Sequence, residues 1–305
     1  MFLLPDVHDI VALALAEDLG VSPERFAPHA LGALDLLARD VTTASSVGLD
    51  ARFVGHIVSR GDSVVAGLPV VAAVYEALST AAGLVDPVDV FPLVAEGARV
   101  RAGTRVAEVE GVAAAVLAGE RTALDFLMLL SGIATETARW VTAAGPELAV
   151  CDTRKTMPGL RVLSKYAVSV GGGTNHREGL FDMVLVKDNH IAVAGSIAAA
   201  VTEARADHPG LTVEVEADTV AQAREAVVVG AHIVLLDNMD DATLIEAVAA
   251  VHEAAAGDGR HVLTEASGGV TFERLGALRA IGVDRVSTST LTMGFRAADF
   301  GLDEA

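Results

Sequence analysis

The sequence predicts an α/β protein of about two domains. Three observations support this. The 305 residues suit about two domains of ordinary size. A composition of 52% hydrophobic and 21% charged residues is typical of a packed globular chain. From Gly119 onward, strand-like segments alternate with helical ones, which is the pattern of a parallel sheet or barrel.

The first 118 residues contain a mixture of helical and strand signals. The expected elements are a helix over 9–18 that stops at Gly20, a loop with a short helix over 21–39, a strand over 52–59, a helix over 70–82, and short Val-rich strands with Gly turns over 94–111. Pro23, Pro28 and Gly32 mark segment 21–39 as an insertion. We interpret the Val-rich segment over 94–111 as structural.

The second half begins with a long helix predicted over 120–143. The six strands that follow are placed at 148–152, 183–187, 211–216, 232–236, 262–266 and 285–287. Each runs into a polar residue at or just past its C-terminal end: Arg154, Lys187, Glu216, Asp237, Ser267 and Ser289. Because the C-terminal ends of barrel strands converge on one mouth, we expect a functional site there.

The charge balance narrows the class of partner. A net charge of −19 argues against nucleic acid or an anionic membrane surface as the main partner. No stretch resembles a signal peptide or a membrane span, and the single cysteine, Cys151, excludes an internal disulfide, so the expected location is cytoplasmic. All three lysines, Lys155, Lys165 and Lys187, fall between residues 155 and 187. A basic enclave in an acidic protein predicts an anionic small ligand.

Two sets of side chains enter the predicted mouth from different strands. The cationic set is Arg154, Lys155, His176, Arg177 and Lys187, and the acidic set is Glu216 and Asp237. Cations of this kind bind carboxylates or phosphates, whereas acids hold Mg²⁺ through its waters or accept hydrogen bonds from sugar hydroxyls. The glycines at 171–173 and the "ASGGV" segment at 266–270 would let backbone N–H groups approach a phosphate.

Each of these residues also has a plainer interpretation. Lys187 fits either a structural ion pair or a Schiff-base lysine, and an isolated acid such as Glu216 is commonly a solvated strand end. We interpret Lys165 as structural, Cys151 as a small core residue, and His190 as a residue that orients its loop.

Long motifs in a fixed order resemble the quinolinate phosphoribosyltransferase family. They include "DTRKTMPGLR" (152–161), "KYAVSVGGGTNHREGL" (165–180), "LVKDNHI" (185–191) and "EASGGV" (265–270). The resemblance implies an N-terminal α/β sandwich domain over 1–128 with the 21–39 insertion, an incomplete α/β (TIM-like) barrel over 129–290, and a tail over 291–305 that returns to the first domain. It also implies a homodimer with shared active sites.

The activity implied by the resemblance is transfer of a phosphoribosyl group from phosphoribosyl pyrophosphate to quinolinate. The products are nicotinate mononucleotide, pyrophosphate and CO₂, with Mg²⁺ as cofactor. Matching positions imply that quinolinate is bound by Arg154, His176, Arg177 and Lys187, together with Arg121 of the partner subunit. They imply that phosphoribosyl pyrophosphate is bound by Lys155, Glu216, Asp237, Ser267, Gly268 and Ser289. Of these, Lys155, Glu216 and Asp237 are the implied catalytic residues, and Glu216 and Asp237 the implied Mg²⁺ ligands, through water.

Four positions depart from the family pattern. Ser289 and Met293 stand where the family has Gly and His, and Asp125 and Met128 stand where it has Asn and Gln. Two alternatives to the quinolinate activity therefore stay open at this point. One is a paralogous pyrophosphorylase, such as that of molybdenum transport operons, which acts on another acidic heterocycle. The other is a non-catalytic dimer that binds an anionic metabolite.

Overall fold

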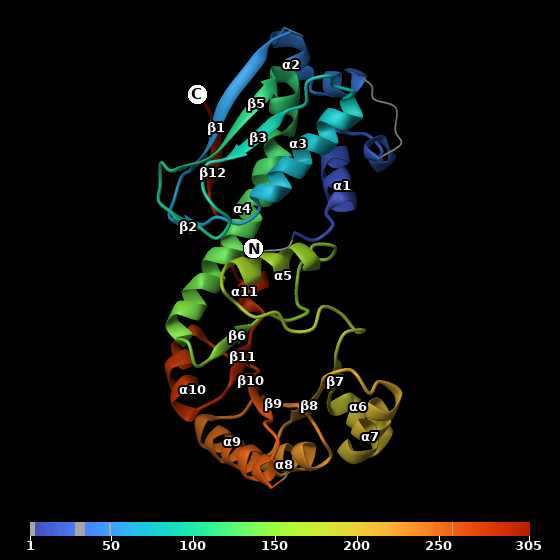
Figure 1. The fold of residues 1–305 in the computed structure, drawn as a ribbon, viewed down its shortest axis with the longest axis vertical. Coiled ribbons are helices and arrows are strands. Elements are labelled where there is room, and N and C mark those ends of the chain that lie inside the picture. Colours follow the sequence, from blue (N-terminus) through green and yellow to red (C-terminus); the bar gives the residue numbers. More distant parts are fainter. Residues whose placement is uncertain (1–3, 28–33, 49, 258) are drawn as a thin grey trace. The chain divides into compact units, whose positions relative to one another are not determined.

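A parallel six-stranded sheet and an antiparallel four-stranded sheet organise the chain (Figure 1). The structure is a computed structural model, and it describes residues 4–27, 34–48, 50–257 and 259–305. Contacts divide the chain into two units. The first holds the chain up to Glu136 together with Met157–Gly171 and Phe295–Ala305, and the second holds Thr137–Thr156 and Gly172–Gly294.

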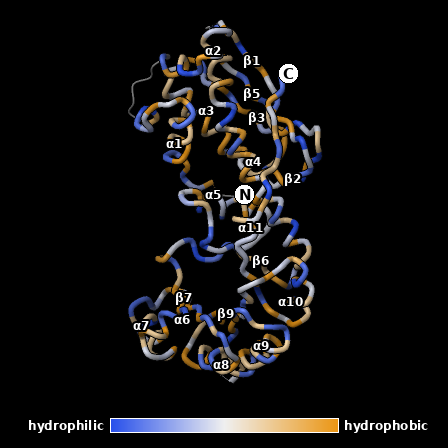
Figure 2. The backbone as a smooth tube through the Cα atoms, turned by 180° about the vertical axis from the view of Figure 1, so that it is seen from behind, coloured by the Kyte–Doolittle hydropathy of each residue, from blue (hydrophilic) through white to orange (hydrophobic). Residues whose placement is uncertain are grey.

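The first unit is built on the antiparallel sheet, whose strand order is β12-β1-β5-β3. The strands are β1 (Arg52–Ser59), β3 (Asp89–Pro92), β5 (Arg105–Val112) and β12 (Phe300–Glu304), and β2 (Ser63–Val64) pairs with β4 (Arg99–Val100) beside them. Helices α1 (His8–Leu19) and α3 (Leu68–Ala82) contact each other, and α3 also contacts β3. The hydrophobic stretches of α3 and α4 (Ala113–Ala144) are orange in Figure 2.

Most elements expected in this half are present. The strand over 52–59 is confirmed, the helices over 9–18 and 70–82 extend by one or two residues, and Gly20 ends α1 in the left-handed conformation at φ 62°. Segment 21–39 contains the 3-10 turns Pro23–Phe26 and Leu34–Arg39, while residues 28–33 lie outside the described residues. A short helix, α2 (Val41–Ser46), follows and is capped by the Asp40 carboxylate, which accepts from the Thr42 and Thr43 N–H groups.

The parallel sheet of the second unit has the strand order β6-β11-β10-β9-β8-β7. Its strands are β6 (Ala149–Cys151), β7 (Val184–Val186), β8 (Val213–Ala217), β9 (Ile233–Asp237), β10 (Leu263–Ser267) and β11 (Arg285–Ser287), so all six predicted strands are confirmed. The last strand, β11, lies beside the first, β6, as in a barrel. The sheet is open between its edge strands β6 and β7, and the expected α/β fold class is confirmed.

Helices follow the strands of this sheet along the chain, and several of them bury apolar residues against it. They are α6 (Asp188–Ala194), α7 (Ile197–Asp207), α8 (Val220–Val228), α9 (Asp241–Ala256), α10 (Leu275–Ile281) after the 3-10 turn Phe272–Arg274, and the short α11 (Thr290–Met293). Helix α8 packs on β8 and β9, whose residues Val215 and Val234 are completely buried. In the part of the chain that the structure describes, no helix is long and apolar enough to cross a membrane.

The two units are not separated at a single point of the chain, because two later segments belong to the first unit. The expected boundary at residue 128 falls inside α4, which continues to Ala144. Residues 157–171, including α5 (Arg161–Val170), group with the first unit, where the Tyr166 hydroxyl donates to Glu96 Oε1 at 2.9 Å. The C-terminal segment pairs antiparallel with β1, with Gly55 opposite Glu304 and Ser59 opposite Phe300. The exact limits 1–128, 129–290 and 291–305 stay a prediction.

Candidate functional site

A cavity of about 370 Å³ lies at the C-terminal ends of the parallel strands. Six of its lining residues were predicted from the sequence: Arg154, Lys155, His176, Arg177, Lys187 and Ser267. Thr153, Leu185, Leu235 and Ser287 complete the lining. Because strands far apart in the sequence end at this one mouth, the cationic residues of the motifs gather around a single space.

The cavity concentrates positive charge. Burial and then the nearby Arg154 cation lower the pKa of Arg177, which indicates two guanidinium groups close together. The Arg154 Nε is buried, and among the described residues it has no hydrogen-bond partner. Buried donors that lack a partner and lie beside a like charge are suited to an incoming anion with several oxygens.

The acidic set lies next to the cations. The Lys187 Nζ contacts the Glu216 carboxylate, whose side chain is 9% exposed. Burial, and then the charge of Glu216, raise the pKa of Asp237, and Asn238 Nδ2 donates to Asp237 Oδ2 at 2.5 Å. Lys187 therefore joins the cationic and acidic sets, which the sequence had divided into separate halves.

His190 acts on the loop after β7. Its Nδ1 accepts a hydrogen bond from the Lys187 backbone N–H at 2.8 Å, and it is not among the residues that line the cavity. This agrees with the interpretation of His190 as a residue that orients its loop.

The turn after β10 brings backbone close to the acidic set. Gly268 and Gly269 have φ values of 76° and 59°, in the left-handed region that favours glycine. A Cβ built on Gly268 would lie 2.3 Å from Asn238 Oδ1, so a side chain there has no room. The Ser287 hydroxyl lies 3.3 Å from the Ser267 hydroxyl at the base of the turn. Two consecutive left-handed glycines leave the backbone of this turn without side chains over it.

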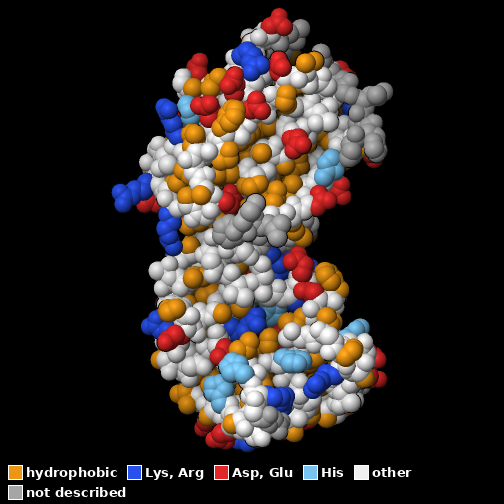
Figure 3. All heavy atoms as spheres, in the orientation of Figure 1, with side chains coloured by type: hydrophobic (Ala, Val, Ile, Leu, Met, Phe, Trp, Pro, Cys, Tyr) orange, Lys and Arg blue, Asp and Glu red, His pale blue; other side chains and the backbone are white. Residues whose placement is uncertain are grey.

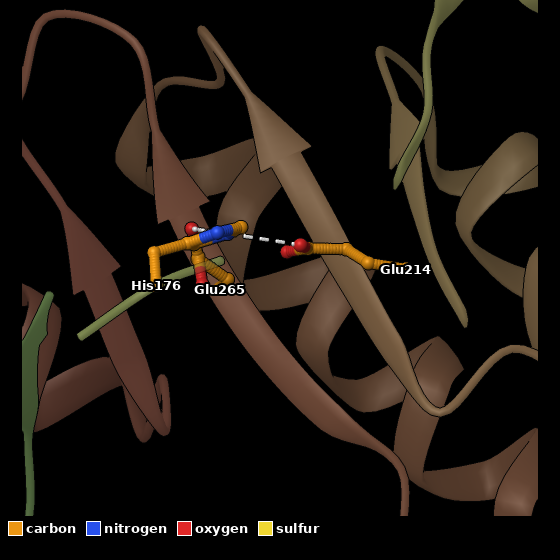
Figure 4. Close-up of side chains that lie close together, drawn as sticks. All are labelled: His176, Glu214 and Glu265. Carbon is orange, nitrogen blue, oxygen red and sulfur yellow. Dashed lines mark ion pairs between the residues drawn. The ribbon is translucent and has the colours of Figure 1, made fainter. Parts of the chain in front are cut away.

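A buried cluster beneath the cavity was not predicted. His176 Nε2 lies 2.9 Å from Glu214 Oε2 and 3.5 Å from Glu265 Oε1, and both acids are completely buried (Figure 4). Arg285 Nε lies 2.7 Å from Glu265 Oε2. The sequence signal that could have found these acids is a glutamate inside a strand that is buried on both faces, as in "VEVE" and "TEASGG". Neither segment shows which basic side chain the glutamate contacts.

The cluster sets the charge of His176. Burial by itself would lower the pKa of this imidazole, but the hydrogen bonds and charges of Glu214 and Glu265 outweigh burial and raise it to about 9. Burial and the nearby Glu265 raise the pKa of Glu214. His176 Nδ1 also accepts the Arg177 backbone N–H at 2.8 Å, a contact that only an unprotonated Nδ1 makes. A proton on Nδ1 of His176 would therefore break its hydrogen bond with the Arg177 backbone.

Several predicted residues lie outside the cavity lining. Four residues at or just after strand ends do not line the cavity: Glu216, Asp237, Gly268 and Ser289. Ser289 precedes α11, and Met293 at its end is 56% exposed. The Thr292 hydroxyl donates to the Lys155 backbone carbonyl at 2.7 Å, so this last segment does contact the site.

Arg121 belongs to the first unit. It lies on α4, 59% exposed, with its guanidinium 3.3 Å from the Asp125 carboxylate. Both residues line a cavity of about 620 Å³ in that unit, among apolar side chains that include Leu13 and Leu129. Figure 3 shows hydrophobic side chains gathered on one face of the first unit. The approach of Arg121 to a second subunit's site stays a prediction.

Two residues are as the plainer interpretations expected. Cys151 is completely buried at the end of β6, and burial raises the pKa of its thiol to about 12. Lys165 is 2% exposed on α5 of the first unit.

Comparisons with known proteins cover nearly the whole chain. Residues 40–131 match the family description "Quinolinate phosphoribosyl transferase, N-terminal domain", and residues 133–303 match "Quinolinate phosphoribosyl transferase, C-terminal domain". The chain is 38% identical to a probable nicotinate-nucleotide pyrophosphorylase [carboxylating] of Bacillus subtilis, over 88% of this chain and 89% of the relative. It is 39% identical to the corresponding protein of Mycobacterium leprae, over 87% and 90%. The structure of NadC from Streptococcus pyogenes superposes with a TM-score of 0.83 at 32% identity and covers 97% of this chain and 95% of that one.

Proposed function

The chain belongs to the quinolinate phosphoribosyltransferase family, and on this premise we propose that it transfers the phosphoribosyl group of phosphoribosyl pyrophosphate to quinolinate. The products are nicotinate mononucleotide, pyrophosphate and CO₂, a step of NAD biosynthesis. The observation that carries the proposal is the cavity itself: Arg154, Arg177 and Lys187 line it, Glu216 contacts Lys187, and Asp237 lies near enough to feel the charge of Glu216.

The cationic side of the cavity suits a dianionic ring. Quinolinate carries two adjacent carboxylates, and Arg154, Arg177 and Lys187 offer donors and charge to both. Clamping both carboxylates fixes the ring in its plane. The pyridine nitrogen is thereby oriented toward the sugar, which lowers the entropic cost of the bimolecular step.

The acidic side suits the sugar. As the bond from C1 of the ribose to pyrophosphate breaks, positive charge develops on the ribose ring, and the Glu216 and Asp237 carboxylates stabilise it. The pyridine nitrogen forms the new bond to C1, and the pyrophosphate leaves with the bonding electrons. The Lys155 ammonium and the N–H groups of the Ser267–Gly268 turn balance charge on the phosphates.

Decarboxylation follows from the new charge on the ring. After alkylation the ring nitrogen is positive, so the 2-carboxylate leaves as CO₂ and its bonding electrons stay at C2 beside that positive charge. A proton from solvent then completes the C2–H bond. No further electron sink is needed.

We propose Mg²⁺ as the cofactor, because the chain's residues fit it. Glu216 and Asp237 present carboxylate oxygens close enough for the charge of one to raise the pKa of the other, and hard cations prefer such oxygens. Bound with pyrophosphate through water, the ion would neutralise the leaving group.

We also propose a homodimer whose sites take Arg121 of the partner subunit, and a cytoplasmic location. Support for the dimer comes from the exposure of Arg121 and from the apolar side chains beside it, such as Leu13, which is 52% exposed. Mixing Arg121→Ala with Lys187→Ala protein should restore about a quarter of the activity per site, because a mixed dimer contains one intact site. No recovery after confirmed subunit exchange would contradict a shared site.

Turnover tests the proposed function directly. Purified protein with Mg²⁺, phosphoribosyl pyrophosphate and quinolinate should release CO₂ and form nicotinate mononucleotide in equal amounts. Arg177→Ala should lose most of this activity, whereas Arg274→Ala, a matched control that removes an arginine paired with Asp241 elsewhere in the same unit, should keep it. Turnover of another acidic heterocycle, with none of quinolinate, would refute the assignment.

A further inference from the structure

Two buried acids have no part in the reaction proposed above. Glu214 on β8 and Glu265 on β10 are both completely buried, beneath the cavity. Burying a carboxylate is costly unless charge and hydrogen bonds compensate for it. Two such groups side by side therefore need an explanation in what they hold.

Both acids meet at one atom of His176. Glu214 Oε2 and Glu265 Oε1 lie 2.9 and 3.5 Å from Nε2, and the ring is 8% exposed (Figure 4). Ionised carboxylates only accept hydrogen bonds, so Nε2 carries a proton. Arg285, directly opposite Glu265 in the register of β10 and β11, contacts the other oxygen of Glu265 at 2.7 Å.

Counting charges identifies the state that the cluster favours. Glu214 and Glu265 supply two negative charges, and Arg285 supplies one positive charge. A proton on Nε2 between the two carboxylates, together with the Arg285 cation, lowers the cost of burying both negative charges.

A metal ion is a poorer occupant of the cluster. The donor atoms of the three residues do lie within 4.8 Å of one another. However, the Arg285 guanidinium already supplies a cation at Glu265 and would repel a second one.

The other ring nitrogen of His176, Nδ1, contacts the backbone of Arg177. The backbone there is held by Asp152, which accepts from the His176 N–H at 2.9 Å and from Asn175 Nδ2 at 2.6 Å. Nδ1 lies 2.8 Å from the Arg177 backbone nitrogen. The Arg177 N–H donates to Nδ1, so the orientation of the ring sets the backbone of Arg177, which lines the cavity.

We propose that Glu214 and Glu265 are positioning residues that hold His176 by Nε2 and balance its charge, so that Nδ1 of the ring fixes the Arg177 backbone and holds Arg177 in place to bind one carboxylate of the substrate. The inference rests on the proposed function, because it concerns how the same cavity binds quinolinate. The charged groups that face His176 or its neighbour are Glu214, Glu265, Arg285, Asp152, Arg154 and Arg177.

Affinity for quinolinate, measured by calorimetry near pH 7.5, tests the proposal. Glu214→Gln keeps the shape of the side chain and removes its charge, and should weaken quinolinate binding about tenfold while the KM for phosphoribosyl pyrophosphate stays within about twofold. In a His176→Ala background the same substitution should change the affinity by less than about twofold, because Glu214 acts through the ring. An undiminished effect in that background overturns the proposal.

A matched control separates positioning from stability. Asp284 lies on the N-terminal side of β11, where its carboxylate accepts from the Thr264 N–H and hydroxyl at 2.7 and 2.8 Å. Asp284→Asn should lower the melting temperature without changing the quinolinate affinity. An equal loss of affinity in this variant would mean that Glu214 only stabilises the sheet.

A measurement without substrate keeps the test independent of the proposed function. Titration of the His176 ring by ¹⁵N NMR, assigned with His176→Ala, should give a pKa above the ordinary 6.5 in the wild type and a value at least about one pH unit lower in Glu265→Gln or Glu214→Gln. A wild-type pKa at or below 6.5 overturns the inference even if turnover succeeds. Absence of turnover with this titration intact refutes the quinolinate activity and leaves the role of the acids in place.

Discussion

The turn after β10 yields a quantitative prediction, because two adjacent glycines there differ in the room that surrounds them. Gly268 and Gly269 both have left-handed φ values, 76° and 59°. An alanine in that region costs about 1–2 kcal/mol at either position. A Cβ on Gly269 meets nothing within 4 Å, whereas a Cβ on Gly268 lies 2.3 Å from Asn238 Oδ1 and 2.9 Å from the Asn238 backbone nitrogen.

Relieving that overlap means moving Asn238, which is itself held at φ 53° and bonded to Asp237. We expect overpacking to add about 2 kcal/mol, so Gly268→Ala should destabilise the protein by about 3–4 kcal/mol and Gly269→Ala by about 1–2 kcal/mol. Because Asp237 moves with Asn238, the KM for phosphoribosyl pyrophosphate should rise at least about tenfold in Gly268→Ala, with a smaller change for quinolinate.

The assay compares melting temperatures and initial rates of the two variants. A difference of about 2 kcal/mol corresponds to a melting temperature that is about 4–8 °C lower for Gly268→Ala. Equal melting temperatures and equal KM values for the two variants would show that the overlap with Asn238 does not matter.

Three further predictions concern single side chains. Lys187→Met removes the cation that contacts the largely buried Glu216. The free energy of unfolding should therefore fall by about 1–3 kcal/mol, with a lower melting temperature, and the turnover rate should fall at least about a hundredfold. A turnover rate within twofold of wild type would contradict this. Against the opposing effect of burial, two buried glutamates raise the pKa of His176 from 6.5 to about 9, which contributes ~3 kcal/mol of stability that is fully present below pH 6.5 and lost as the pH rises through 9. The melting temperature should fall more steeply over that range for wild type than for His176→Gln, and parallel curves would count against the shift. Cys151 should resist iodoacetamide near pH 8 until the protein unfolds, because burial raises the pKa of its thiol to about 12; rapid labelling of folded protein would contradict the burial.

Much of the second unit was predictable because its signals are local. Short apolar strands that alternate with helices are visible within windows of ten to fifteen residues, and all six predicted strands are present. The rule that barrel strands end at one mouth then brought Arg154, Lys187 and Ser267 together without any knowledge of distances. The short edge strand β3 of the first unit was missed, since its residues Asp89–Pro92 carry no clear alternation.

Sequence motifs predicted which residues belong to the candidate site better than which of them contact one another. Motifs identified the cationic residues and the two acids, yet placed them in separate halves, whereas Lys187 contacts Glu216 directly. The roles of Glu214 and Glu265 were not predicted, although both residues lie in strand motifs. The partner of a residue across a sheet depends on strand order and register, and the sequence of one strand encodes neither.

The α/β class, the order of the strands along the chain and the polar residues at their ends were predictable from sequence, since these follow from periodicity and residue type over short distances. The pairing of strands was not: β11 lies beside β6, β12 pairs with β1, and β8 and β10 bring two acids to one histidine. The physical reason is that such pairings depend on how whole faces pack and on which buried charges can be balanced, and both are properties of the assembled chain.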